Sequence, residues 1–274
     1  MTTHFDVARF CRLWRAHWAE SWRDYAWFAG VTAIVDLVFI AFFFSTESRS
    51  SFSTFRFGGQ VAWFTCGLFA SGSIFAGRYF KQLASPGSAL TMLMRPASLF
   101  EKWLLAFIYI SLLFPLAYTL GYCLLNFPVV QLAKALYEPI SCASCKPSEV
   151  DFSFYLPLLT LGAQKSTAVE AAAFFRLEIF WLLLLWSVQA LVSGGTVFFK
   201  HSAVLRTILF YFLLAIGLTW LGAAPRPGVF WYQAVDEIIA HDTVEYVFSL
   251  VLWAGLPLLL WVVVFFHFKE REVS

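Results

Sequence analysis

The chain has 274 residues, of which 60% are hydrophobic, 20% are aromatic and only 13% are charged. So few charged residues cannot cover the surface of a soluble globule of this size, which excludes a soluble domain and predicts a membrane protein. The net charge of +2 is too small to indicate a nucleic-acid partner, and we expect the basic residues mainly to set the membrane topology.

Several apolar segments are long enough to cross a bilayer. A backbone in lipid must satisfy its own hydrogen bonds, so each span needs about 20 mostly apolar residues in a helix. The segments do not alternate in hydrophobicity as the strands of a membrane barrel do. The sequence therefore predicts an all-α polytopic membrane protein, a single transmembrane domain with six transmembrane helices at residues 25–44, 60–79, 102–126, 174–198, 204–223 and 245–267.

Residues 1–24 predict an amphipathic interfacial helix that joins the first span by a bend near Asp24. This stretch contains no short apolar core followed by a small-residue cleavage site, so we expect the first span to be retained. A plain juxtamembrane anchor would have the same pattern. Aromatic and apolar residues at helical spacing alternate there with basic ones: Phe10, Leu13, Trp14, His17 and Trp18, with Arg9, Arg12, Arg15 and Arg23.

Asp36 lies well inside the first predicted span. A charged side chain at the bilayer centre costs several kcal/mol and is normally compensated. Asp36 is therefore expected either to face a transport path or to pair with a neighbouring helix or a second copy of the chain, and we favour the pairing role.

A polar segment, residues 80–101, separates the second and third spans. It contains Pro86 and Pro96, and Ser98 is followed three residues later by Glu101. Ser and Glu at this spacing predict a capping box at the start of a helix. A short helix, a turn and the start of the third span fit the pattern, and a solvated loop on the membrane surface fits the spacing equally well.

The predicted outer loop, residues 127–173, contains Cys142 and Cys145 in the stretch CASCKPSEVDFSFY. A zinc site would need a second cysteine pair or histidines at ligand spacing, and neither is present in the sequence. On the oxidising side of a membrane we expect a local disulfide between the two cysteines, with a redox role as the weaker alternative.

Lys and Arg are in excess on the side of the membrane that carries both termini and the short loops, which predicts that both termini are cytoplasmic. This side would carry the four N-terminal arginines and Arg78, Lys81, Arg95, Lys102, Lys200, Arg206, Lys269 and Arg271.

Two stretches resemble a known family: LMRPASLFEKWLLAF at 93–107 and FHFKEREV at 266–273. With the six-span layout, they resemble the permease subunits of type-2 ABC exporters, in a bacterial subgroup that has an LPAS…EK-like coupling segment. Arg95 stands where many of those sequences carry Leu.

The resemblance implies a permease dimer in the bacterial cytoplasmic (inner) membrane, with a second copy or a paralogue and with cytoplasmic ABC ATPase subunits as partners. ATP and Mg would bind to the ATPase, and no cofactor to this chain. The coupling segment would dock on the ATPase, and residues 224–244 would form re-entrant outer helices, with an interfacial loop as the alternative. The residues implied in coupling are Met92, Leu93, Met94, Arg95, Pro96, Ala97 and Ser98, with Glu101 and Lys102 anchoring the third span.

The predicted function is therefore the transport subunit of an ATP-driven exporter. The alternative is a non-transporting membrane scaffold or assembly protein that recruits a cytoplasmic partner. We do not expect an enzyme, because no HExxH, GxSxG or GxGxxG motif is present and GAQKST at 162–167 lacks the glycine that a phosphate loop needs before its lysine. Lipid-like, peptide and antibiotic cargo would all suit an apolar, aromatic-rich path.

Overall fold

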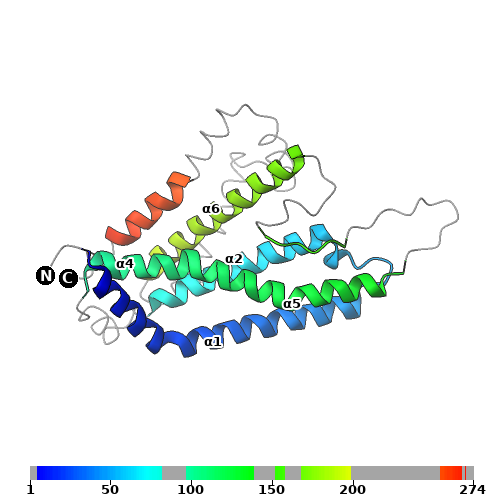
Figure 1. Cartoon of the computed structure of the whole chain (residues 1–274), viewed down its shortest axis with the longest axis horizontal. Coiled ribbons are helices and arrows are strands. Elements are labelled where there is room, and N and C mark those ends of the chain that lie inside the picture. Colours follow the sequence, from blue (N-terminus) through cyan, green and yellow to red (C-terminus); the bar gives the residue numbers. More distant parts are fainter. Residues whose placement is uncertain are drawn as a thin grey trace. The chain divides into compact units, whose positions relative to one another are not determined.

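The computed structural model describes residues 5–81, 97–138, 152–157, 168–198, 254–266 and 269 (Figure 1). These residues are mostly helical and contain no strand. In chain order the elements are α1 (Val7–Thr46), the 3-10 helix η1 (Ser53–Phe55), α2 (Phe57–Lys81), α4 (Leu99–Ile108), the π-helix η2 (Tyr109–Leu113), α5 (Phe114–Leu136), α6 (Ala168–Phe198) and a last helix, Ala254–Phe266.

Three helical stretches in the described part of the chain are long and apolar enough to cross a membrane: Val7–Thr46, Leu99–Leu136 and Glu178–Thr196. The all-helical class is thereby confirmed for these residues, and membrane character is supported. The 25-residue α2 matches the predicted second span in position but is not one of these three stretches. Its glycines, serines and Gln60 lower its mean hydropathy. The predicted span at 204–223 and part of that at 245–267 lie outside the described residues, so the count of six stays a prediction.

The N-terminal segment and the first span form one helix. α1 runs without interruption from Val7 to Thr46, and no helix end separates residues 7–24 from the span at 25–44. The sequence around Asp24 contains neither proline nor glycine before Gly30, so nothing in the local backbone chemistry stops the helix there.

The third span differs in length from the expectation. α4, η2 and α5 follow one another without a break, so the helix continues to Leu136 even though Pro128 removes one backbone donor from its interior. Residues 127–136 and 168–173, both assigned to the outer loop by the sequence, are therefore helical. The π-helix η2 interrupts the regular α-helical hydrogen bonding, and single π-turns of this kind are frequent at functional sites.

The chain divides into two compact units. Unit 1 comprises Met1–Trp14, Gly72–Phe114 and Ser166–Ser274, and unit 2 comprises Arg15–Ser71 and Pro115–Lys165. In unit 1, aromatic rings fill the space between helices: the ring centroids of Phe107 and Trp261 are 5.2 Å apart, and the Trp103 Nε1 donates to the Trp261 carbonyl oxygen at 3.2 Å.

The core of unit 2 includes the buried residues Phe52, Phe55, Ala133 and Phe152. Phe52 has a φ of 38°, the left-handed conformation that side chains other than glycine rarely adopt. Its ring is nevertheless almost fully buried, with its centroid 5.5 Å from that of Phe44. Burial of the ring therefore offsets the backbone strain at this turn between α1 and η1.

Gly59 allows η1 to pack tightly against the first turn of α2. A methyl group added at Gly59 would lie 2.5 Å from the carbonyl oxygens of both Ser53 and Thr54, whereas one at Gly58 would meet no atom within 4 Å. Backbone atoms cannot move aside as the end of a flexible side chain can. Position 59 therefore requires glycine for steric reasons.

We expect Gly59→Ala to destabilise the protein by about 1–3 kcal/mol, the usual range for overpacking. Gly58→Ala is the matched control and should leave stability unchanged or slightly raised, because alanine favours the helix. Thermal unfolding of the full chain in mild detergent measures both. Equal melting temperatures for the two variants would contradict the close approach.

Candidate functional site

The sequence-predicted sites are only partly within the described residues. Met92, Leu93, Met94, Arg95 and Pro96 lie outside them, as do Cys142, Cys145 and the segment 224–244. The structure does describe the end of the coupling segment, from Ala97 to Glu101, and it describes Lys102 and Asp36.

The predicted capping box at the start of α4 is present. The Glu101 backbone N–H donates to Ser98 Oγ at 3.3 Å, and the Ser98 backbone N–H donates to Glu101 Oε2 at 2.9 Å. Two backbone donors at the helix start are thereby satisfied. The capping box therefore stabilises the first turn of α4, which follows the predicted docking segment in the sequence.

Glu101 also binds the N-terminal helix, within unit 1. Arg9 Nη2 donates to Glu101 Oε1 at 2.7 Å, Arg9 Nε donates to Oε2 at 2.8 Å, and the Asp6 backbone N–H donates to Oε1 at 3.0 Å. The Glu101 side chain is fully buried, while that of Arg9 is 20% exposed. This two-point contact between guanidinium and carboxylate fixes orientation as well as distance. Sequence reasoning had assigned Glu101 an anchoring role but had not paired it with Arg9.

We expect Glu101→Gln to lower stability by about 1.5–3 kcal/mol, because hydrogen bonds to a charged group are worth about this much. Glu138→Gln is the matched control. Glu138 and Arg49 form an ion pair at 3.4 Å whose side chains are 73% and 63% exposed, and exposed pairs contribute about 0–1 kcal/mol. Comparable shifts of the melting temperature in the two variants would show that the Arg9–Glu101 pair contributes no more to stability than the exposed Arg49–Glu138 pair.

Asp36 binds two neighbouring helices of unit 2. Trp63 Nε1 on α2 donates to Asp36 Oδ1 at 2.7 Å, and Asn126 Nδ2 on α5 donates to Asp36 Oδ2 at 2.9 Å. Asp36 is therefore hydrogen-bonded to two helices of unit 2. Trp63 and Asn126 were not singled out from the sequence, although a lone asparagine at the end of an apolar span was a usable signal.

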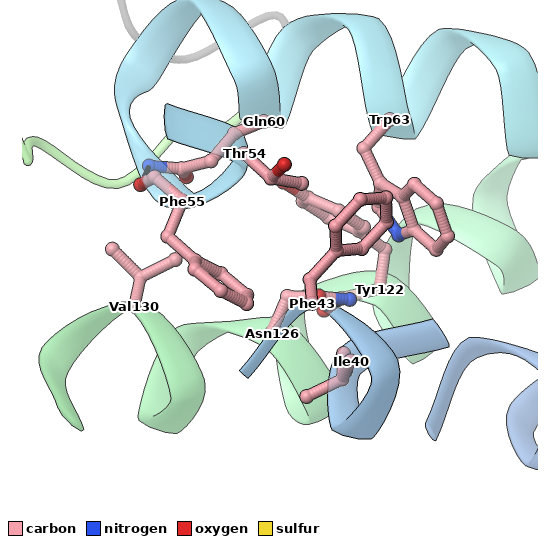
Figure 2. A pocket seen from close by; sticks show the side chains of 9 residues that line it. All are labelled: Ile40, Phe43, Thr54, Phe55, Gln60, Trp63, Tyr122, Asn126 and Val130. Carbon is pink, nitrogen blue, oxygen red and sulfur yellow. Dashed lines mark hydrogen bonds between the residues drawn. The ribbon is translucent and has the colours of Figure 1, made fainter. Parts of the chain in front are cut away.

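A small cavity lies next to this cluster in unit 2. Its volume of about 10 Å³ admits roughly one water. Figure 2 shows its walls, which come from α1, η1, α2 and α5: Ile40, Phe43, Thr54, Phe55, Gln60, Trp63, Tyr122, Asn126 and Val130. Both hydrogen-bond donors to Asp36 are among these residues, whereas Asp36 itself does not line the cavity.

Gln60 holds three segments of unit 2 together. Its Nε2 donates to the carbonyl oxygens of Phe55 at 2.8 Å and Ser153 at 3.0 Å, and its Oε1 accepts from the Tyr155 backbone N–H at 2.9 Å. The side chain is buried, so these bonds do not compete with solvent. The segment 152–157 is thereby bound to the start of α2.

Gln189, in unit 1, is also buried, but unlike Gln60 its side-chain amide makes no hydrogen bond to the described residues. It has no exposed surface, and neither its Oε1 nor its Nε2 has a hydrogen-bond partner among the described residues. A methyl group on Gly72 would lie 3.2 Å from Gln189 Nε2, so α2 approaches this amide closely. One turn away, Trp186 Nε1 donates to the Ser111 carbonyl oxygen in η2 at 2.8 Å.

The two glutamines predict opposite effects of the same substitution. Gln60→Met removes three hydrogen bonds and leaves backbone groups unpaired, which should cost about 2 kcal/mol or more. Gln189→Met replaces an unpaired buried amide by an apolar group of similar size and should leave the melting temperature unchanged or higher. A fall in stability for Gln189→Met as large as that for Gln60→Met would show that its amide has a partner beyond the described residues.

Within the described ranges, no group of three or more His, Cys, Asp and Glu side chains is placed to hold a metal ion. No metal site is therefore assigned to these residues.

No protein-family model, curated protein or solved structure matches the chain. The likeness to type-2 ABC exporter permeases thus rests on the sequence layout and its two motifs.

Proposed function

We propose that the chain is the permease subunit of an ATP-driven exporter of the type-2 ABC class, working as a dimer and moved by a separate cytoplasmic ATPase. The observation that carries the proposal is the bond between the N-terminal helix and the start of α4. Glu101 follows, by three residues in sequence, the segment that would dock on the ATPase, and it makes this bond with Arg9. The Ser98 capping box stabilises the same start of α4.

The bond explains how a small movement of the docking segment would reach the membrane helices. A rigid element transmits displacement, whereas a flexible loop absorbs it. Because Glu101 accepts from Arg9, Asp6 and Ser98 together, the first turn of α4 and the first turn of α1 are held as one piece within unit 1. ATP hydrolysis, with its Mg, would take place on the partner chain.

The membrane assignment belongs to the same proposal. Three long apolar helices in the described residues support a membrane location. The bacterial inner membrane, six spans, two cytoplasmic termini and export rather than import all come from the charge distribution and the exporter resemblance. Lipid-like, peptide and antibiotic cargo would all suit an apolar, aromatic-rich path.

The proposal is tested by crosslinking the tagged protein in native membranes, purifying it in mild detergent and identifying its partners by mass spectrometry. We expect a stoichiometric ATPase with a Walker A motif, and we expect Arg95→Glu to reduce its recovery at least tenfold, because reversing a charge in a docking surface opposes association.

Lys134→Glu is the control for this experiment. It makes the same charge reversal at a position predicted to lie on the outer side of the membrane, so ATPase recovery should not change. Both variants should reach the membrane in equal amounts. If a non-ATPase cytoplasmic protein is recovered in place of the motor, the exporter proposal fails and the scaffold function takes its place.

A further inference from the structure

The carbonyl oxygen of Ser111, in the π-helix η2, accepts a hydrogen bond from a side chain of another helix. In a regular α-helix this oxygen would accept from the backbone N–H four residues later, but that residue is Pro115, which has no N–H. Trp186 Nε1 on α6 donates to it, at 2.8 Å and within unit 1. The bond therefore depends on the position of η2 along α6.

A second hydrogen-bond donor lies one turn further along α6. Gln189 follows Trp186 by three residues, so the two side chains are neighbours on the helix surface, about 4.5 Å apart along the axis. The Gln189 amide is fully buried, and neither Nε2 nor Oε1 has a partner among the described residues. A methyl group on Gly72 would lie 3.2 Å both from Gln189 Nε2 and from the ring of Phe114, the residue that follows η2. The unpaired amide therefore lies close to the end of η2.

Ser111 carries the groups that the Gln189 amide needs. Its hydroxyl is buried and also has no partner in the described ranges, so Ser111 has a carbonyl acceptor and an unused O–H donor. The described arrangement pairs the Ser111 carbonyl with Trp186 and leaves Ser111 Oγ, Gln189 Oε1 and Gln189 Nε2 unpaired, which is unfavourable away from water. Pairing Ser111 with Gln189 would satisfy all three of these atoms and leave only the Trp186 indole N–H without its bond.

We infer that η2 has two registers along α6. In the first register, the described one, Ser111 binds Trp186, and in the second register η2 has moved one turn along α6 and Ser111 binds Gln189. Packed helices switch between discrete states by such one-turn shifts. The polar pairs favour the second register, whereas the edge-to-face contact of Trp186 with Phe107, at 6.3 Å between ring centroids, favours the first. The inference does not rest on the exporter proposal, since it concerns this chain alone.

The π-helix itself suits a change of register. It is five residues long, and a π-helical turn contains more residues than an α-helical turn. Rewinding these residues to α-helical geometry would move Ser111 along the helix axis without opening the helix. η2 can therefore take up part of the one-turn shift while its backbone hydrogen bonds are kept.

The test is a double-substitution cycle, read by thermal unfolding of the full chain in mild detergent. Trp186→Phe removes the indole donor and should move the population to the second register, in which Gln189 is hydrogen-bonded. In that background Gln189→Met should lower the melting temperature by roughly 2–4 °C, the effect of about 1 kcal/mol of lost hydrogen bonding. In the wild type the same substitution should leave the melting temperature unchanged or higher, because the amide is unpaired there.

Trp103→Phe is the matched control background. Trp103 Nε1 also donates to a carbonyl oxygen of another helix in unit 1, that of Trp261 at 3.2 Å, but it is not part of the two registers. Gln189→Met should therefore have no destabilising effect in this background. If Gln189→Met is without effect in all three backgrounds, the amide is unpaired in each and the inference is wrong. If it destabilises all three equally, Gln189 has one fixed partner and the inference is wrong as well.

A second measurement leaves Trp186 in place, which keeps the inference testable if Trp186→Phe does not fold. In the full chain with isotope-labelled tryptophan, the indole resonance of Trp186 should show microsecond-to-millisecond exchange, the timescale of helix register shifts. Gln189→Met removes the bond that stabilises the second register and should suppress this exchange, whereas the resonance of Trp103 should be the same in both proteins. Equal exchange at Trp186 with and without Gln189, or no exchange in the wild type, would refute the two registers.

Discussion

The pairing of polar side chains inside an apolar helical domain is the constraint on which the rest of this structure depends. A polar group in hydrocarbon cannot turn to water, so a partner on another element stabilises it, and the amide of Gln189 is an exception among the described residues. Asp36 meets α2 and α5, Gln60 meets the 152–157 segment, and Glu101 meets the N-terminal helix. Apolar contacts alone would allow neighbouring helices to slide, whereas each of these bonds fixes one register.

Aromatic residues play the complementary role. Rings such as Phe107 and Trp261 in unit 1, or Phe44 and Phe55 in unit 2, fill the volume between helices at centroid distances of 5.2 and 4.7 Å. Tilted and edge-to-face contacts tolerate small shifts without leaving voids. Polar pairs therefore specify where helices meet, and aromatic packing fills space around them.

The sequence was sufficient for the features that depend on local chemistry. The helical class, the position of α2 and the Ser98 capping box follow from periodicity and residue spacing, and the structure has them. It was insufficient where distant residues decide the outcome. Arg9 and Glu101 are 92 positions apart, and Asp36 and Asn126 are 90 apart, so no spacing rule could pair them. The helical continuation to Leu136 was missed because Pro128 favours a helix end locally, although residues 129–136 are mostly apolar and continue the helix.

Gln60 shows how the described helices of unit 2 hold the non-helical segment 152–157 with no strand described beside it. Its amide donates to the carbonyl oxygen of Ser153 and accepts from the N–H of Tyr155, two groups that flank residue 154. A residue in a neighbouring parallel strand would make the same two bonds, so one side chain takes the place of an edge strand. The amide has its donor at Nε2 and its acceptor at Oε1, and this fixes the direction in which segment 152–157 runs along α2. A glutamate in its place would have the same shape but would turn an acceptor toward the Ser153 carbonyl, so the strand-like match belongs to the amide alone.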